Sequence, residues 1–189
     1  MKKIFVVSGP SGSGKTTLLN QLLKDSRLKR RLMKSISLTT RPKRTGEKNG
    51  RDYFFISEPE FRRRRRAEKL LEWTKYLGYY YATPKGFPGR GFRKSKHLIL
   101  CLDLKGALYI KRAYPKNAVT IFVAPPSLDA LRHRIVKRCH KTKQEEIKGR
   151  LMLARQEVLA SRRYDYCIVN KDLPEAAKRL KGIIFKELT

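Results

Sequence analysis

Acidic residues are scarce in this chain of 189 residues: 16 Asp and Glu stand against 46 Lys and Arg, which gives a formal net charge of +30. Proteins that use ion-pair networks for stability mix charges of both signs, so the shortage of acids excludes such networks across the surface. A surface of this sign attracts polyanions, which include nucleotides, RNA, DNA and acidic membranes. The charge therefore indicates a negatively charged ligand, but it does not identify which one.

Long hydrophobic runs and paired cysteines are also missing. No apolar stretch reaches the length of about 20 residues that crosses a bilayer, and Met1–Lys3 leads directly into a strand-like run, so we expect neither a membrane span nor a signal peptide. Cys101, Cys139 and Cys167 lie far apart, which is typical of reduced thiols in a cytoplasmic protein. Cys139–His140 has no second pair at zinc spacing, so a zinc site is not expected.

The segment Gly9–Thr16, with the sequence GPSGSGKT, carries the strongest functional signal. It follows the apolar run Ile4–Val7 and precedes an amphipathic helix pattern, which is the context of a phosphate-binding loop. The loop amides can surround phosphate oxygens, while the N-terminus of the next helix faces the same anion. Lys15 adds a charge near the β- and γ-phosphates, and Thr16 offers a hydroxyl to Mg²⁺. The predicted nucleotide-phosphate site comprises Gly9, Pro10, Ser11, Gly12, Ser13, Gly14, Lys15, Thr16 and Thr17.

Apolar, β-branched runs alternate with helical patterns along most of the chain. Strands are predicted over Ile4–Ser8, His97–Asp103, Val119–Val123 and Tyr166–Val169. Helices are predicted over Lys15–Lys24, Leu128–Lys137, Glu145–Leu159 and Pro174–Lys186, with N-caps at Ser127 and Asp172. This alternation predicts an α/β fold, in which helices flank a parallel sheet and the ligand lies at the carboxyl ends of the strands.

The segment 35–83 breaks the alternation, because it is rich in Thr, Tyr, Phe and turn signals. A short mixed or antiparallel insert fits this composition better. Within the insert, Arg41, Arg44 and the hydroxyl of Tyr53 can clamp a second phosphate, distinct from the one at the glycine-rich loop. The alternative is a basic hairpin that binds nothing.

Glu72 is notable because acids are scarce around it. A carboxylate accepts two parallel hydrogen bonds, and guanine, unlike adenine, offers two adjacent donors. A buried Glu72 flanked by the hydroxyls of Ser37 and Thr83 would select guanine, since the wrong base leaves its charge unpaired. The alternatives are a surface acid of a helix for Glu72 and ordinary strand packing for Tyr79–Tyr81.

Six segments occur in the order and spacing of guanylate kinases: GPSGSGKT, SLTTRPKRTGEKNGRDYFF, LEW, YYYATPK, LCLDLKGA and YDYCIVNKDL. The chain resembles this family from Lys3 to about Ile184. The resemblance implies transfer of the γ-phosphoryl group of ATP to GMP with Mg²⁺, in a P-loop core with a GMP-binding insert and a mobile lid. The implied boundaries are about 1–34, 84–137 and 151–189 for the core, 35–83 for the insert and 138–150 for the lid.

The same resemblance implies a role for each matching residue. The GMP phosphate would be held by Arg41, Arg44, Tyr53 and Tyr81, and the base by Ser37, Glu72 and Thr83. Asp103 is implied in GMP binding and, with Thr16, in holding Mg²⁺, whereas Asn170 matches a residue near the adenine of ATP. The implied catalytic residues are Lys15, Arg41, Arg134, Arg138 and Arg150. They would neutralise and align the two anions, so no general base is needed.

Some positions depart from the family pattern. Cys101 stands where the family usually has an acid, Ala82 replaces a usual glycine, and the loop 86–91 replaces a helical stretch. The run Arg62–Arg66 is also unusual for the family. It is either a solvated face of a helix or a contact for RNA or another acidic surface.

Two other functions fit parts of the sequence. A GTPase would use the D-x-x-G spacing of Asp103–Gly106, but the acid in Asn170–Asp172 comes one position too early for the N-K-x-D guanine reader. A catalytically weak scaffold or a nucleic-acid-associated protein would use the basic surface, but such scaffolds characteristically lose the P-loop. We therefore expect ATP and GMP as partners and no membrane contact. Nucleic-acid contact stays an alternative, and both a monomer and a dimer fit the sequence.

Overall fold

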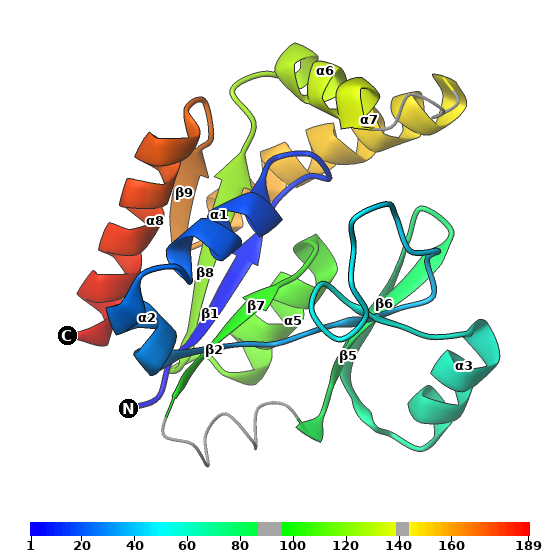
Figure 1. Cartoon of the computed structure of the whole chain (residues 1–189), viewed down its shortest axis with the longest axis horizontal. Coiled ribbons are helices and arrows are strands. Elements are labelled where there is room, and N and C mark those ends of the chain that lie inside the picture. The colour runs from blue at the N-terminus through cyan, green and yellow to red at the C-terminus, as the bar shows by residue number, and fades with distance from the viewer. Residues whose placement is uncertain (87–95, 139–143) are drawn as a thin grey trace.

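The computed structural model describes residues 1–86, 96–138 and 144–189. Five parallel strands form the core sheet in the order β2-β7-β1-β8-β9, with β1 at its centre (Figure 1). Their bounds are Leu32–Lys34 for β2, His97–Cys101 for β7, Ile4–Ser8 for β1, Ala118–Ala124 for β8 and Tyr166–Val169 for β9. The predicted α/β class with a parallel sheet is confirmed.

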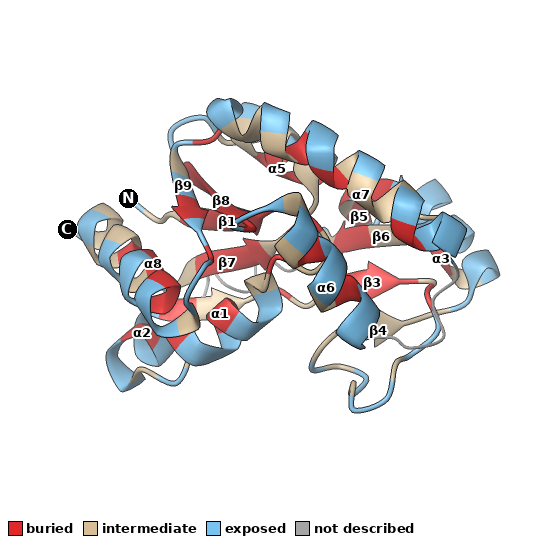
Figure 2. Cartoon of the chain, turned by 90° about the horizontal axis from the view of Figure 1, so that it is seen from above, coloured by how far each residue is buried: buried red, intermediate tan, exposed pale blue. Residues whose placement is uncertain are grey.

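Both faces of the core sheet are covered, so its central strands are buried throughout. Successive residues of β1 point to opposite faces: Phe5 and Val7 belong to one apolar cluster, Ile4 and Val6 to the other. The first face is packed against α1 (Lys15–Leu22), α2 (Ser26–Arg31) and α8 (Leu173–Leu188), and the second against α5 (Leu104–Ala113) (Figure 2).

Two further helices pack on each other beside the glycine-rich loop. These are α6 (Leu128–Arg138) and α7 (Gln144–Leu159), which is followed by the short helix η1 (Ala160–Arg163). Their contact buries Leu131, Ile135, Ile147 and Ala154, which recur at helical spacing. The pair therefore stands over the cleft as a unit with its own small apolar core.

The insert forms a second sheet in the order β4-β3-β6-β5. Its strands are β3 (Leu38–Thr39), β4 (Phe54–Phe55), β5 (Leu70–Tyr76) and β6 (Tyr79–Pro84), and α3 (Glu58–Arg66) covers it by burying Phe61. The β3–β4 pair is parallel and the β3–β6 and β5–β6 pairs are antiparallel, so the predicted mixed insert is confirmed.

Several element boundaries differ from the sequence prediction. The strand predicted to run to Asp103 ends at Cys101, because the Asp103 carboxylate caps α5 and accepts a hydrogen bond from the Gly106 N–H at 2.9 Å. The first helix ends at Leu22, and Asp25 caps the separate helix α2. The predicted caps at Ser127 and Asp172 are confirmed by hydrogen bonds from the N–H groups of residues 130 and 175.

None of the helices in the described ranges has the length and apolar character needed to cross a membrane.

Candidate functional site

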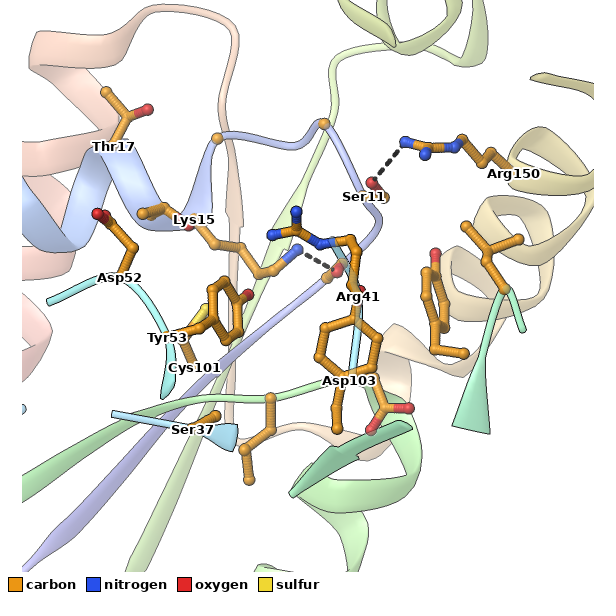
Figure 3. A pocket seen from close by; sticks show the side chains of 18 of the residues that line it. Ser11, Lys15, Thr17, Ser37, Arg41, Asp52, Tyr53, Cys101, Asp103 and Arg150 are labelled. Carbon is orange, nitrogen blue, oxygen red and sulfur yellow. Dashed lines mark hydrogen bonds between the residues drawn. The ribbon is translucent and has the colours of Figure 1, made fainter. Parts of the chain in front are cut away.

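A cleft of about 670 Å³ lies between the glycine-rich loop of the core and the insert sheet. Lys15 enters it from the loop side and Arg41 and Tyr53 from the insert (Figure 3). The predicted site residues that line it are Gly9, Ser11, Gly12, Gly14, Lys15, Thr16, Thr17, Ser37, Arg41, Arg44, Tyr53, Glu72, Tyr81, Asp103, Arg134, Arg150 and Asn170. The two predicted anion sites therefore share one cavity.

Pro10, Ser13 and Thr83 are not among the lining residues, but each holds one that is. The Lys15 Nζ donates to the carbonyls of Pro10 and Gly9 at 2.8 and 2.6 Å, and the Ser13 carbonyl accepts from Asn170 Nδ2 at 2.7 Å. Among the described residues, the buried Ser13 hydroxyl has no hydrogen-bond partner. Buried hydroxyls are normally paired, so this hydroxyl is an exception inside the loop.

Asn170 ties the loop to the end of the sheet. Its N–H donates to the carbonyl of Ala124 at the end of β8 at 2.8 Å, and its own carbonyl accepts from Arg134 Nη2 at 2.9 Å. The approach is close at Gly14, where an added Cβ would lie 2.3 Å from Asn170 Nδ2 and where φ is +94°. Only glycine fits this position without displacing Asn170, and the following amides begin α1.

Arg41 and Arg44 are both organised by Glu47, which the sequence analysis does not assign to the site. Arg41 is 8% exposed and donates through Nη2 to Glu47 Oε1 at 2.8 Å, while the Arg44 N–H donates to Glu47 Oε2 at 2.8 Å. Burial alone would lower the pKa of Arg41 and raise that of Glu47, but their mutual contact outweighs it and both stay charged. The signal available in the sequence was the nearness of Glu47 to the arginine pair.

Glu72 lies on β5 and is 7% exposed, so the alternative of a surface acid of a helix is wrong. Burial raises its pKa to about 7, and the nearby charge of Asp103 adds to this effect. Thr83 Oγ1 donates to Glu72 Oε1 at 2.7 Å, and Ser37 is buried in the same wall. A buried carboxylate keeps its charge only where hydrogen-bond donors or opposite charges surround it.

Glu157 and Tyr76 also line the cleft, and no motif predicts them. Glu157 continues the buried stripe of α7 three residues after Ala154, and burial raises its pKa to about 7. Within the described ranges, Glu157 Oε2 and Tyr76 Oη are buried without a hydrogen-bond partner. A carboxylate at an otherwise apolar helix position was the only sequence signal for this pair.

The remaining predicted site residues are the arginines of α6 and α7 and the candidate ligands of a metal ion. Arg150 of α7 donates through Nη1 to Ser11 Oγ at 3.4 Å and through Nε to Glu146 at 3.0 Å. Thr16 and Asp103 both line the cleft, but the described residues contain no group of three metal-ligating side chains. Burial raises the pKa of the Cys101 thiol, so this position carries no negative charge. The side chain of Arg138 and the pair 139–140 lie outside the described part of the chain.

The chain is similar to known proteins along nearly its whole length. A family model described as guanylate kinase matches residues 1–187. A guanylate kinase of Caldanaerobacter subterraneus is 39% identical over 184 residues, covering 97% of this chain and 87% of that protein. One from Thermotoga maritima is 40% identical over 185 residues, with 98% and 87% covered. A crystal structure of guanylate kinase from Anaplasma phagocytophilum has a TM-score of 0.80 and 32% identity, covering 98% of this chain and 86% of that one.

Proposed function

We propose, from the premise that this chain belongs to the guanylate kinase family, that it transfers the γ-phosphoryl group of ATP to GMP and releases ADP and GDP. The observation that carries the proposal is the single cleft in which Lys15 faces Arg41, Arg44 and Tyr53. Two anions brought together there would otherwise repel each other. The cations supply the neutralisation and alignment on which phosphoryl transfer depends.

On the donor side, we assign the loop Gly9–Thr16 and Thr17 to the phosphates of ATP. Lys15 exchanges its bonds to the loop carbonyls for phosphate oxygens. Asn170 lies at the adenine side of the loop. Thr16 and Asp103 fit Mg²⁺, because that ion binds proteins through one or two oxygen ligands and otherwise through phosphate and water. Bound with ATP, Mg²⁺ would offset the charge of the phosphoryl oxygens.

On the acceptor side, Arg41, Arg44, Tyr53 and Tyr81 hold the GMP phosphate. The Arg41 guanidinium already donates a hydrogen bond to an anion, the Glu47 carboxylate. This supports the assignment, because a phosphate is also negatively charged and accepts hydrogen bonds from arginine. Glu72 accepts the two adjacent donors of guanine, with Ser37 and Thr83 beside it. Adenine would leave the buried carboxylate unpaired, which is the basis of selectivity.

Arginines of α6 and α7 complete the charge around the transferred group. Arg134 and Arg150 line the cleft, and Arg150 already contacts the loop through Ser11. We assign Arg138 the same role. We also place the GMP-binding insert at about 35–83 and the lid at about 138–150. Cationic side chains placed at the transferred phosphoryl group raise the rate by about 10³–10⁵.

The compartment we propose is the cytoplasm. Cys101 and Cys167 are free thiols, as expected where disulfides are kept reduced.

The proposal is tested by ADP release with ATP and, in turn, GMP, AMP, UMP or no acceptor. We expect turnover with GMP only. ADP release without an acceptor would indicate hydrolysis of ATP, and equal turnover with AMP would refute the role of Glu72. A GTPase would instead hydrolyse GTP in the absence of GMP. Lys15→Ala should abolish turnover. Arg44→Ala should raise the KM for GMP far more than that for ATP, whereas equal effects on both would contradict its acceptor role.

A further inference from the structure

A second hollow, of about 920 Å³, lies between β5 and α5, away from the glycine-rich loop. We call it the α5 groove. The cationic and aromatic residues that line it include Arg65, Trp73, Lys105, Tyr109, Arg112 and Arg163. The kinase reaction assigns no role to any of them. Glu72 forms part of the wall between this groove and the nucleotide cleft, since it lines both.

The arginine run of α3 contributes less free charge than its sequence suggests. Arg62 is paired with Glu58 at 2.6 Å, and Arg63 and Arg64 are paired with Glu60 at 2.7 and 2.6 Å along the same helix. These three therefore form a solvated face with its own counter-charges. Arg65 differs, because its guanidinium lies 5.0 Å from the centre of the Trp73 ring and lines the α5 groove.

Positive charge in the α5 groove is largely uncompensated. Lys105, Arg112 and Arg163 are exposed, and none of them forms an ion pair with a carboxylate of the described residues. Lys111 also lines the groove, but its charge is compensated by Asp165 at 2.8 Å.

Two carboxylates also line the groove, but Glu68 is paired with Lys85 at 3.9 Å and Glu72 is buried. A concave surface with an excess of positive charge concentrates anions more strongly than a flat one. The natural occupant is a polyanion long enough to reach several of these side chains.

Two aromatic rings are exposed in the same groove. Trp73 is 45% exposed and Tyr109 is 39% exposed, although rings of this size are usually more buried. Nucleic acid bases stack on aromatic rings and on arginine planes when they are not paired in a duplex. The Arg65–Trp73 stack therefore offers a platform for a base, while Lys105 and Arg112 lie where they can contact phosphates.

We propose that the α5 groove binds single-stranded nucleic acid, RNA or DNA, at a site separate from the kinase cleft. A bilayer surface would not enter a concave groove, and membrane-bound helices present an apolar face that α5 lacks on this side. An acidic peptide would match the charge but leave both rings unused. The combination of unpaired cations with exposed aromatic rings is characteristic of single-strand binding.

The experiment uses the fluorescence of Trp73, which is the only tryptophan in the chain. The full-length protein is titrated with short oligo(U) and, separately, oligo(dT) at several salt concentrations. We expect quenching, because a stacked base changes the surroundings of the Trp73 ring, and a log–log salt slope of about −0.7 for each phosphate contacted. Equal binding of both oligomers indicates a backbone-and-base site, and tighter oligo(U) binding indicates contacts to the 2′-hydroxyl.

Two double variants separate the groove from the general charge. Lys105→Gln with Arg112→Gln should weaken oligonucleotide binding about tenfold. Arg30→Gln with Lys178→Gln removes the same charge from exposed positions on α2 and α8, over the opposite face of the core sheet, and should weaken it less than about twofold. Both doubles should retain turnover with GMP, which shows that they are folded.

Three results would overturn the proposal. Equal losses in the two doubles would mean that net charge alone attracts the oligonucleotide. Inorganic polyphosphate that binds as tightly as the oligonucleotide and quenches Trp73 equally would mean that bases play no part. Vesicles of anionic phospholipid that displace the oligonucleotide and lose affinity in the groove double would identify a membrane contact instead.

Discussion

Single residues determine how the side chains on the insert side of the cleft are hydrogen-bonded in the ligand-free protein. Glu47 bridges Arg41 and the backbone of Arg44, so one carboxylate keeps both arginines at the cleft. Glu72, in contrast, is buried beside the like charge of Asp103, and few hydrogen-bond donors surround it. In the proposed assignment, the phosphate subsite is therefore satisfied internally, and the base subsite is not.

Glu47→Gln should lower the free energy of unfolding of the nucleotide-free protein by about 1–3 kcal/mol, since Arg41 loses its carboxylate partner while staying buried. GMP should then stabilise the variant more than it stabilises the wild type, because its phosphate supplies the missing anion. Thermal melting with and without GMP measures both effects. A smaller shift with GMP than in the wild type would mean that Glu47 stays bonded to Arg41 in the complex.

The pH dependence of GMP use should follow Glu72. Its pKa of about 7 in the free protein means that the carboxylate protonates as the pH falls through 7, and the protonated form accepts poorly from guanine. We therefore expect kcat/KM for GMP to fall below about pH 7, since this parameter reports the free enzyme. The second ionisation of the GMP phosphate also lies near 6, so Glu72→Gln is the control. It should be less active and should lose the step at 7.

At the scale of elements, the sequence predicted the central strands and long helices well because their buried positions recur with a clear period. Strand β1 matches its prediction, and α6 and α7 differ from theirs by one residue at one end. The elements α2 and β2 have six and three residues, too few for a period to show. The helix α5 is also absent from the prediction; its cap, Asp103, belongs to a run that continued to look like strand.

The candidate site was predictable where its residues are contiguous. The glycine-rich loop and the pair Arg41 and Arg44 follow from local spacing. Glu157 is 146 residues away from Ser11 by number, and it reaches the same cavity only because α7 packs beside the loop. Such a contact depends on tertiary packing, which a single sequence does not reveal.

The close packing of α5 on β5 gives a prediction at this scale. In Gly106→Ala, the added Cβ would lie 2.9 Å from Glu72 Oε2 and 3.2 Å from Asp103 Oδ1. The shift of Glu72 should raise the KM for GMP by about tenfold to a hundredfold. The KM for ATP should rise less, because the added Cβ approaches Asp103 less closely than Glu72. Gly182→Ala in α8 is the matched control, because nothing lies within 4 Å of its added Cβ. It should stabilise the protein by about 0.5–1 kcal/mol, and equal kinetic effects in both variants would refute the explanation.

The whole molecule places buried carboxylates at the junction between its two sheets and the α6–α7 pair. Glu157 has a pKa of about 7 instead of 4.5, because burial penalises its charged form. A carboxyl group with a raised folded-state pKa contributes stability below its unfolded pKa, and that contribution is lost as the pH rises through the folded one. The protein should therefore become less stable from about pH 4.5 to 7 on account of this group.

Glu157→Gln removes this titration and keeps the shape of the side chain. Relative to wild type, we expect the variant to gain about 1–3 kcal/mol of unfolding free energy at pH 8, with the difference disappearing near pH 4. Denaturant unfolding without nucleotide at several pH values measures the difference. A constant difference at every pH would show that packing, not charge, is responsible.

The core sheet and the insert sheet share no strand. The backbone hydrogen bonds of the core sheet, which positions the glycine-rich loop, therefore do not depend on those of the insert sheet, which positions Arg41 and Glu72. Substitutions that change which base is bound can accumulate in the insert sheet while the hydrogen bonds of the core sheet stay as they are. Evolution can in this way change the acceptor specificity without altering the loop that binds the donor.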